Sequence, residues 1–393
     1  MGKKRILYIP NLSYLANPVF FSVIKHLPDF QNIYFDADYY KEYENSANRL
    51  ANDQQAMQLF DEYYRIDKND KINFKSENEE INFIKNKIEG LKPDAFVTIS
   101  DKTFVYKICT AYFPDIPIFV IQTCAIKNSF PGISFKQKLA SLIKNNSFRL
   151  KNNIPFAEDT ISYKLIWSKF WVRDKSVYDE NKFFETGNPG YDALFLNPLQ
   201  KHENLKKQFG IDEDKKVILI TLTKKRTIGE EKFNKFLDIY SEVIKKNENI
   251  FFIIKPHPLE NPEYLNKKFN VNEAKNLKII FEEKLENLFK ISDLLISSWS
   301  VTVYEALINN IPAIVLNPQN EFDIKTFTPD AENIDIAADD KSLNALIHQS
   351  LFNLNYSKFT ERKNNFLKKV LTIIDGSSGK LASDIIRAKT NEK

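Results

Sequence analysis

The sequence predicts an α/β protein made of two doubly wound domains that face each other across a cleft, each a parallel sheet covered by helices. The chain has 393 residues, which is too long for one comfortable core and suits two domains. Short apolar runs alternate with helical patterns along its length, as they do in parallel sheets with helical crossovers. A stretch rich in Gly and Pro separates two such series. These three observations carry the prediction.

The first series of strands lies in the N-terminal half, where short apolar runs end in polar or turn residues. Residues 39–64 and 77–90 between them have helical patterns, and Gly90 marks the end of the second. We expect four strands here, Ile6–Pro10, Ile33–Asp36, Ala95–Ser100 and Ile118–Gln122.

The second half repeats this plan with runs that are almost continuously apolar, as is typical of strands buried on both faces. The last segment, residues 358–391, is charged and helical in pattern. The strands expected in this half are Val217–Leu222, Ile250–Ile254, Leu277–Phe281, Leu294–Ser297 and Ala313–Leu316.

The segment Thr186–Asp192 contains Gly187, Pro189 and Gly190 and is the best candidate for a linker. We therefore predict an N-terminal domain over residues 1–186, which binds the acceptor, and a C-terminal domain over residues 187–393 with the last helix, which binds the donor. Ligands of doubly wound domains bind at the carboxyl ends of the strands. Functional residues are therefore expected in the loops that follow strands.

The composition excludes several classes of protein. The net charge of +4 is too small for a broad nucleic-acid-binding face. Cys109 and Cys124 give neither a disulfide framework nor a metal-ligand pattern, so we expect no metal. The sequence has no recognisable signal peptide and no run long enough to span a bilayer. We expect a cytoplasmic protein whose membrane contact, if it has any, is peripheral.

The strongest motif is Lys255-Pro256-His257-Pro258, which ends the apolar run Ile250–Ile254. The prolines restrict the backbone and so fix the direction of the side chains. An imidazole that donates a hydrogen bond beside an ammonium group suits a phosphate oxygen. A structural turn with a buried histidine is the alternative. We predict that Lys255 binds phosphate and that His257 takes part in catalysis.

A second motif joins the strand Leu294–Ser297 to a helix through hydroxyl residues. Free backbone N–H groups and hydroxyls at a helix start suit an anion. Thr302 and Glu305 have the spacing of a capping box, although Ser298 or Ser300 can also cap the helix. Glu305 is placed to accept hydrogen bonds from a ribose diol. The predicted donor-binding residues here are Ser297, Ser298, Ser300, Thr302 and Glu305.

Other candidates follow other strands. The three cations Lys224-Lys225-Arg226 follow Val217–Leu222, and we predict that this run faces the same phosphates, with Lys225 and Arg226 as the binding residues and solvated surface as the alternative. In the first half, Asp101 is the best-placed carboxylate to deprotonate an acceptor hydroxyl, or else it caps the next helix. Gln122 is placed to orient a sugar.

Two further features concern partners and cofactors. The loop after the first strand lacks a Gly-x-Gly-x-x-Gly pattern, so no dinucleotide cofactor is expected. Residues 116–157 contain no acidic residue, but several Lys and one Arg. This basic stretch suits an anionic membrane surface or an acidic acceptor, or it is a solvated helix face.

The Lys-Pro-His-Pro loop, followed by Ser-Asp-Leu-Leu-Ile-Ser-Ser from Ser292 and then Glu-Ala-Leu, resembles bacterial surface-polysaccharide transferases of the GT-B fold. The pairing is similar to the His-Pro and Ser-Ser or Ser-Thr motifs of sialyltransferases and Kdo transferases. Those motifs hold the phosphate of a CMP-sugar, which implies this role for His257, Ser297 and Ser298. Sialyltransferases also carry an acidic triplet that supplies the base. This chain lacks the triplet, and Asp101 lies in a comparable place.

Two other families share parts of the pattern. The segment Thr186–Leu194 is similar to the hinge of UDP-N-acetylglucosamine 2-epimerases and of capsule-synthesis proteins. Those epimerases have Asp-Ser-Gly-Gly where this chain has Ser298-Trp299-Ser300-Val301, so their glycine-mediated approach to a diphosphate is missing. CDP-glycerol glycerophosphotransferases share the His-Pro loop and the strand-loop-helix plan.

The sequence therefore predicts a glycosyltransferase that moves a sugar from a nucleotide-sugar donor to a glycan, oligosaccharide or glycolipid acceptor. A CMP-sugar is the favoured donor and a UDP-sugar the second, and the products expected are capsule or lipopolysaccharide. We expect inversion at the sugar and no metal or cofactor. The alternatives are polyol phosphate transfer from a CDP-polyol such as CDP-glycerol, a UDP-N-acetylglucosamine 2-epimerase-like activity, and a nucleotide-sugar-binding module without catalysis.

Overall fold

The computed structural model describes most of the chain. The described residues are 2–10, 13–37, 54–66, 74, 76–100, 103–123, 161–172, 179–257, 260–271, 273–298, 300–318 and 332–392. Two compact units are present, and each is described by itself. Unit 1 comprises Met1–Ala193 and Leu371–Lys393, and unit 2 comprises Leu194–Val370. Within the described part, no helix has both the length and the apolarity that crossing a bilayer requires.

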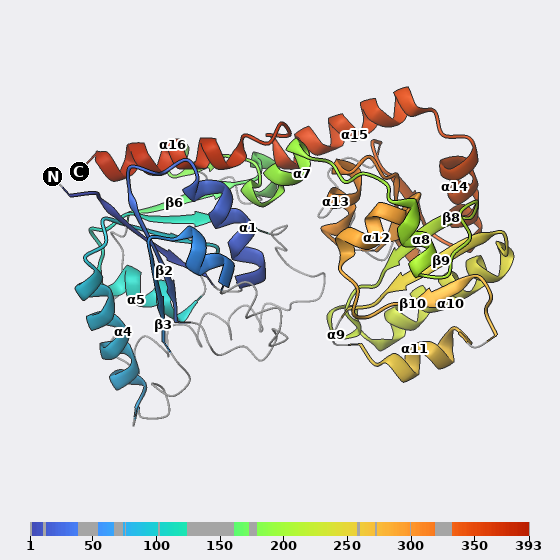
Figure 1. Ribbon diagram of the computed structural model, residues 1–393, viewed down its shortest axis with the longest axis horizontal. Coiled ribbons are helices and arrows are strands. Elements are labelled where there is room, and N and C mark those ends of the chain that lie inside the picture. Colours follow the sequence, from blue (N-terminus) through green and yellow to red (C-terminus); the bar gives the residue numbers. More distant parts are fainter. Residues whose placement is uncertain are drawn as a thin grey trace. The chain divides into compact units, whose positions relative to one another are not determined.

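The division differs from the predicted domain boundary at residue 187 in two respects. It falls after Ala193, because the predicted linker packs inside unit 1, where the short helix η3 (Pro189–Tyr191) contacts α1 (Ser13–Ile24). The chain also returns to unit 1 near its end, so helix α16 (Ser378–Asn391) lies beside α1 and not in the second unit as predicted (Figure 1).

A parallel sheet forms the centre of unit 1, with the strand order β3-β2-β1-β4-β5-β6-β7. The four predicted strands are all present, and the structure adds β3, β6 and β7. The residues Glu62–Tyr64, predicted as helix, are in β3 and pair with β2. The strands are β1 (Arg5–Ile9), β2 (Gln31–Asp36), β3 (Glu62–Arg65), β4 (Ala95–Thr98), β5 (Ile118–Ile121), β6 (Ser162–Ile166) and β7 (Phe183–Glu185).

Helices cover both faces of this sheet, because alternate side chains of each strand point to opposite faces. Ile6 and Tyr8 of β1 pack with Phe20 of α1 and Ile386 of α16. Leu7 and Ile9 belong to the cluster on the other face, with residues of α4 (Glu77–Leu91) and α5 (Phe104–Tyr112). The expected doubly wound arrangement is therefore present in unit 1.

Unit 2 contains a second parallel sheet, with the strand order β10-β9-β8-β11-β12-β13. Its five predicted strands are present, and β13 is added. The strands are β8 (Lys216–Thr221), β9 (Ile250–Lys255), β10 (Leu277–Ile279), β11 (Leu294–Ser297), β12 (Ala313–Leu316) and β13 (Asp335–Ala337). The chain order reverses between β8 and β11, and this reversal is the topological switch point of a doubly wound sheet.

Unit 2 also contains helices. They are α8 (Glu203–Gln208), α9 (Lys225–Ile228), α10 (Glu230–Lys246), α11 (Pro262–Lys268), α12 (Leu285–Ile291), α13 (Thr302–Ile308), α14 (Asp340–Phe352) and α15 (Tyr356–Leu371), and the short helix α7 (Asp192–Leu196) spans the boundary between the two units. The predicted helical segment 358–391 is therefore two helices, α15 and α16. Positive φ angles at Thr372 (59°) and Gly376 (83°) break it between them.

Candidate active site

The candidate site lies at the carboxyl edge of the sheet in unit 2, at the switch point. Strands β8 and β11 are neighbours there, and Thr221 is the register partner of Ser297. The loop after β9 reaches the same edge, because Thr221 also pairs with Lys255. The structure thus brings together the three loops whose residues were predicted to bind the donor.

Hydroxyl groups connect the ends of β8 and β11. The Thr221 hydroxyl donates to Ser297 Oγ over 2.7 Å and lies 3.1 Å from Thr302 Oγ1. Thr223 Oγ1 and Ser298 Oγ are 2.5 Å apart. Ser297 is fully buried (0 % exposed), whereas Thr223 is partly exposed. Ser297 therefore belongs to an inner network, and the pair of Thr223 and Ser298 forms the outer one.

The start of α13 differs from the predicted capping box. Val301 is the N-cap residue, and its side chain makes no capping hydrogen bond. The Ser300 hydroxyl instead accepts a hydrogen bond from the Thr302 backbone N–H over 3.2 Å. Because Val301 is the N-cap residue, Glu305 is the fourth residue of the helix and not the third, so Thr302 and Glu305 do not form a capping box.

His257 lies half-buried directly after β9, and Glu260 donates its backbone N–H to the His257 carbonyl over 2.9 Å. Burial lowers the pKa of the His257 imidazole to about 4, and the positive charges of Lys224 and Lys255 act in the same direction. The ring is therefore neutral at pH 7 and carries one N–H donor. The chain has four histidines, and the other three, His26, His202 and His348, do not follow a strand.

The predicted phosphate ligand Lys255 binds the protein itself. Its ammonium group donates a hydrogen bond to the backbone carbonyl of Phe281. Burial lowers the pKa of Lys255, and the charges of Glu282 and Glu283 oppose this effect. Lys255 thus holds the segment after β10 against the end of β9.

Lys225 is also engaged by protein groups. Its backbone N–H donates to Glu260 Oε1 over 2.8 Å, and its ammonium group donates to Glu230 Oε1 over 2.6 Å. The same ammonium group lies 5.3 Å from the centroid of the Tyr264 ring. Its predicted partner in phosphate binding, Arg226, is exposed.

Sequence reasoning named Lys224 only as part of the cationic run, and it did not single out Thr221 and Thr223 as members of this site. Lys224 is partly buried, and its charge reaches His257. The signal for Lys224 was its position as the first cation after the strand. The signal for the threonines was the run Thr221-Leu222-Thr223, which places two hydroxyls at a strand end.

Glu305 lies on α13 and is partly buried. Burial raises the pKa of its carboxyl group to about 7. No described residue donates a hydrogen bond to this carboxyl group. Near neutral pH the group exists in both protonation states and can either accept or donate a hydrogen bond.

The raised pKa of Glu305 gives a prediction for the variant Glu305→Gln. In the folded protein the carboxyl keeps its proton up to about pH 7, while its ordinary pKa is 4.5. Folding therefore takes up a proton in this window, and the carboxyl lowers stability as the pH rises from 4.5 to 7. The glutamine variant avoids this loss, and we expect it to gain about 3 kcal/mol relative to wild type by pH 8.

Thermal unfolding of wild type and Glu305→Gln between pH 5 and pH 8 checks this prediction. The lowered pKa of His257 makes stability rise with pH in both proteins, which is opposite to the effect of Glu305. The difference in Tm between wild type and Glu305→Gln therefore isolates the contribution of Glu305. Glu286→Gln on α12, whose carboxylate is exposed, is the matched control. A difference in Tm that stays constant with pH would contradict the assignment.

In unit 1 the predicted sugar ligand Gln122 has a structural role. Its side-chain carbonyl accepts the Trp167 backbone N–H over 2.9 Å, and its backbone carbonyl accepts the Trp167 indole N–H over 2.7 Å. Gln122 is also buried. It therefore ties the end of β5 to the residue that follows β6.

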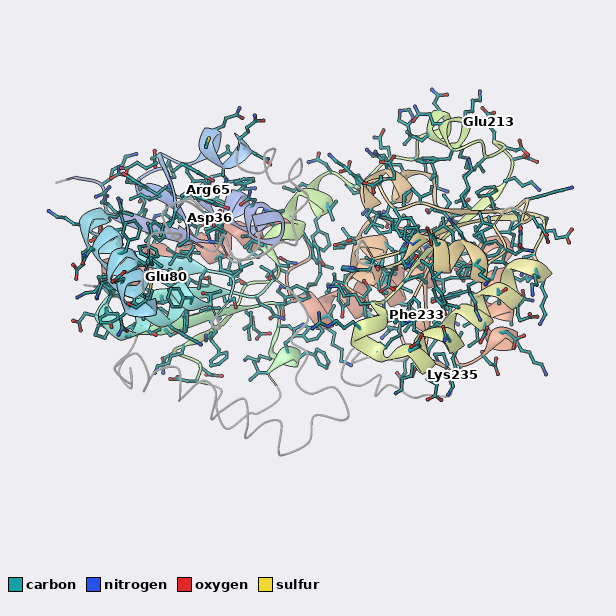
Figure 2. The ribbon with its side chains drawn as sticks, turned by 90° about the horizontal axis from the view of Figure 1, so that it is seen from below. Asp36, Arg65, Glu80, Glu213, Phe233 and Lys235 are labelled. Atoms are coloured by element: carbon teal, nitrogen blue, oxygen red, sulfur yellow. The ribbon has the colours of Figure 1, made fainter. Side chains whose placement is uncertain are left out.

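The predicted base, Asp101, lies outside the described residues, as do Pro258 and the basic stretch from residue 124 to 157. Among the described residues at the carboxyl edge of this sheet, Asp36 is a buried carboxylate. It is the register partner of Arg65, and Figure 2 shows the two residues close together at the ends of β2 and β3.

Two Rossmann-like units, each a parallel sheet covered by helices, have the fold called GT-B. The family model described as CDP-Glycerol:Poly(glycerophosphate) glycerophosphotransferase matches residues 19–368. The chain belongs to this family. No curated protein matches it significantly.

Solved structures show the same fold. A protein assigned as a UDP-N-acetylglucosamine 2-epimerase from Listeria monocytogenes has a TM-score of 0.66 at 15 % identity, over 100 % of this chain and 98 % of that one. The UDP-GlcNAc 2-epimerase from Neisseria meningitidis bound to UDP-GlcNAc has a TM-score of 0.64 at 16 % identity, over 98 % and 100 %.

The wall teichoic acid polymerase TagF, in an H444N variant, has a TM-score of 0.57 at 14 % identity, over 99 % of this chain and 89 % of that one. The same variant soaked with CDPG gives a TM-score of 0.55. At such identities these likenesses show the fold alone. The family match supports the predicted alternative, CDP-polyol phosphate transfer, better than the favoured CMP-sugar, and the resemblance to sialyltransferases and Kdo transferases is not confirmed.

Proposed function

We propose that this protein transfers glycerol phosphate, or a related polyol phosphate, from a CDP-polyol to a hydroxyl group of a cell-surface polymer. The observation that carries the proposal is the neutral His257 at the switch point, near Lys224 and at the same sheet edge as the Thr223–Ser298 hydroxyl pair. Membership of the glycerophosphotransferase family supports the choice of donor.

In the proposed reaction, an acceptor hydroxyl oxygen attacks the β-phosphorus of the CDP-polyol. A new P–O bond forms, and the bond from this phosphorus to the bridging oxygen breaks. CMP leaves with that electron pair, and the hydroxyl proton passes to a base. The products are CMP and a phosphodiester, so atoms and charge balance. Positioning and electrostatic stabilisation of the phosphoryl group supply most of the catalysis in such transfers.

Each proposed donor-binding group has a distinct part. The His257 N–H donates to a phosphate oxygen on which charge builds up as CMP leaves. The Ser298 hydroxyl, paired with Thr223, donates to a second oxygen. Ser297 and Thr302 hold the ends of β11 and β8 and the start of α13 together through Thr221. The Glu305 carboxyl binds the ribose hydroxyls. The role of Asp101 as the base stays a prediction.

Product analysis tests the proposal. Purified protein is incubated with CDP-glycerol and a poly(glycerophosphate) acceptor, and CMP release and chain growth are measured. A phosphodiester-linked product supports the proposal, because a glycosidic link formed from a nucleotide sugar would contain no phosphorus. Growth only with CMP- or UDP-sugars would favour sugar transfer. Nucleotide binding without release of CMP or growth of any acceptor would identify a binding module.

The hydroxyl pair gives a prediction that does not depend on the acceptor. Ser298→Ala is expected to raise the KM for CDP-glycerol about tenfold by removing a hydrogen-bond donor to phosphate. Thr223→Val removes the partner of Ser298 while keeping its shape, and it should raise the KM less. Because Thr223 acts through Ser298, the double variant should be no worse than Ser298→Ala.

Initial rates with CDP-glycerol as the varied substrate give the KM and kcat of all three variants. Thr223→Ser, which keeps the hydroxyl, is the conservative control and should behave as wild type does. Independent, additive effects of Thr223→Val and Ser298→Ala would show that the two hydroxyls do not act as a pair.

A further inference from the structure

Three lysines, Lys224, Lys225 and Lys255, lie near His257, and the structure distinguishes them by what their ammonium groups bind. Lys255 donates to the Phe281 carbonyl, and Lys225 donates to Glu230 Oε1 over 2.6 Å. Among the described residues, none forms a hydrogen bond or an ion pair with the ammonium group of Lys224. One of the three positive charges near His257 is thus left without a counter-charge in the described part of the chain.

The backbone holds Lys224 beside the histidine loop. On its N-terminal side, Leu222 donates its N–H to the Lys255 carbonyl over 3.2 Å. On its C-terminal side, Lys225 donates its N–H to Glu260 Oε1 over 2.8 Å. The segments 222–225 and 255–260 are therefore joined at both ends, with Lys224 in one and His257 in the other.

We propose that Lys224 is the cation that neutralises the phosphate charge of the donor beside His257, and that Lys225 and Lys255 maintain the loops. The inference rests on the proposed function, because it takes a nucleoside diphosphate group as the ligand. A phosphate placed between the Lys224 ammonium group and the imidazole receives a positive charge and an N–H donor together. Thr223 follows β8, as Lys224 does, and its hydroxyl partner Ser298 follows the neighbouring strand β11.

The electrostatics of the free protein agree with this assignment. The charge of Lys224 disfavours a proton on His257, which keeps the imidazole neutral before the ligand binds. A bound anion would offset that charge, so binding of a diphosphate should raise the pKa of His257 and favour proton uptake. Lys225 cannot substitute for Lys224 without leaving Glu230.

Isothermal titration of CDP-glycerol, CDP and UDP, at low and high salt, tests the inference on the full chain. Lys224→Met is expected to weaken the binding of CDP-glycerol and CDP about tenfold or more and to flatten the dependence of Kd on salt, because one ionic contact is lost. Lys224→Arg keeps the charge and should restore most of the affinity. Lys235→Met on α10, labelled in Figure 2, is the control for loss of a surface charge and should bind as wild type does.

The competing assignments are tested by Lys225→Met and Lys255→Met in the same titration. A larger loss of affinity in either of them than in Lys224→Met would overturn the inference, and so would a Lys224→Met protein that binds within twofold of wild type. Thermal unfolding of Lys224→Met shows whether the variant is folded. Should it unfold, Lys224→Gln replaces it in the titration.

Failure of this inference can be separated from failure of the proposed function. If wild type and Lys224→Met bind CDP-glycerol equally well, the role of Lys224 is refuted and the proposed function is not. Wild type that binds UDP but not CDP, with the affinity still dependent on Lys224, refutes the proposed donor and supports the role of the lysine. Wild type that binds neither nucleotide refutes both.

Discussion

Replacing His257 with alanine should lower kcat/KM for CDP-glycerol by about a thousandfold while the protein stays folded. The variant loses the N–H that the proposed reaction aims at the oxygen where charge builds up, and removing one such donor typically costs a hundred- to a thousandfold in rate. The half-buried position of the ring at the end of β9 makes little contribution to the core, so the loss should be in rate and not in stability.

Initial rates of CMP release measure this effect, with far-UV circular dichroism to confirm folding. His348→Ala on α14, where the imidazole is exposed, is the matched control and should keep wild-type rates. His257→Gln retains an N–H donor and should recover part of the activity. Turnover near the wild-type rate in His257→Ala would remove the imidazole from the mechanism. Because the pKa of His257 is about 4, its protonation should not reduce kcat/KM between pH 6 and pH 8.

The second large effect is expected on stability, from Asp192→Ala in unit 1. The Asp192 carboxylate is buried (1 % exposed) and accepts three hydrogen bonds. The donors are the Ser22 hydroxyl at 2.6 Å and the backbone N–H groups of Ser378 and Gly379 at 3.1 and 2.7 Å. Alanine leaves the Ser22 hydroxyl on α1 and the two backbone N–H groups at the start of α16 without this acceptor. We expect a loss of about 3 kcal/mol in the free energy of unfolding.

Urea unfolding of Asp192→Ala and wild type measures this loss. Asp192→Asn keeps one side-chain acceptor and should lose less. Asp384→Ala on α16, whose carboxylate is exposed and bonds Arg387 on the same helix, is the control and should stay within about 0.5 kcal/mol. A midpoint for Asp192→Ala equal to that of wild type would mean that the three donors find other partners.

The residues around Asp192 also explain why the predicted linker packs inside unit 1 and is not an open connection between the units. Gly187 and Gly190 were interpreted as signs of a flexible connection. In the structure Gly187 has φ +72°, and its backbone lies so close to Ser378 that a Cβ would be 2.5 Å from the Ser378 hydroxyl. A glycine is needed at this position because the backbone packs closely against the segment from Leu371 to Ser378, where the chain re-enters unit 1. Contacts between residues so far apart in sequence leave no local signal.

The central strands were predictable, and the added ones were not. β8 and β9 are continuous apolar runs because they are buried on both faces of the sheet. β3 and β7 lie at the edges of their sheet, and β3 reads Glu-Tyr-Tyr-Arg. A short, partly exposed edge strand needs no apolar run. Its assignment depends on pairing with β2, which is a tertiary interaction.

The candidate site shows the same limit at the level of single side chains. The sequence by itself determined the doubly wound plan and the positions of His257, Ser298 and Glu305 after strands, because these follow from apolar periodicity and from where strands end. Tertiary structure decided which of the neighbouring cations has a protein partner. Lys224 and Lys225 are equivalent in sequence, but Glu230 and Glu260 bind Lys225 through side chain and backbone. Hydrogen bonds from elsewhere in the fold fix that difference, because an ammonium group that already has a protein partner has less to offer a phosphate.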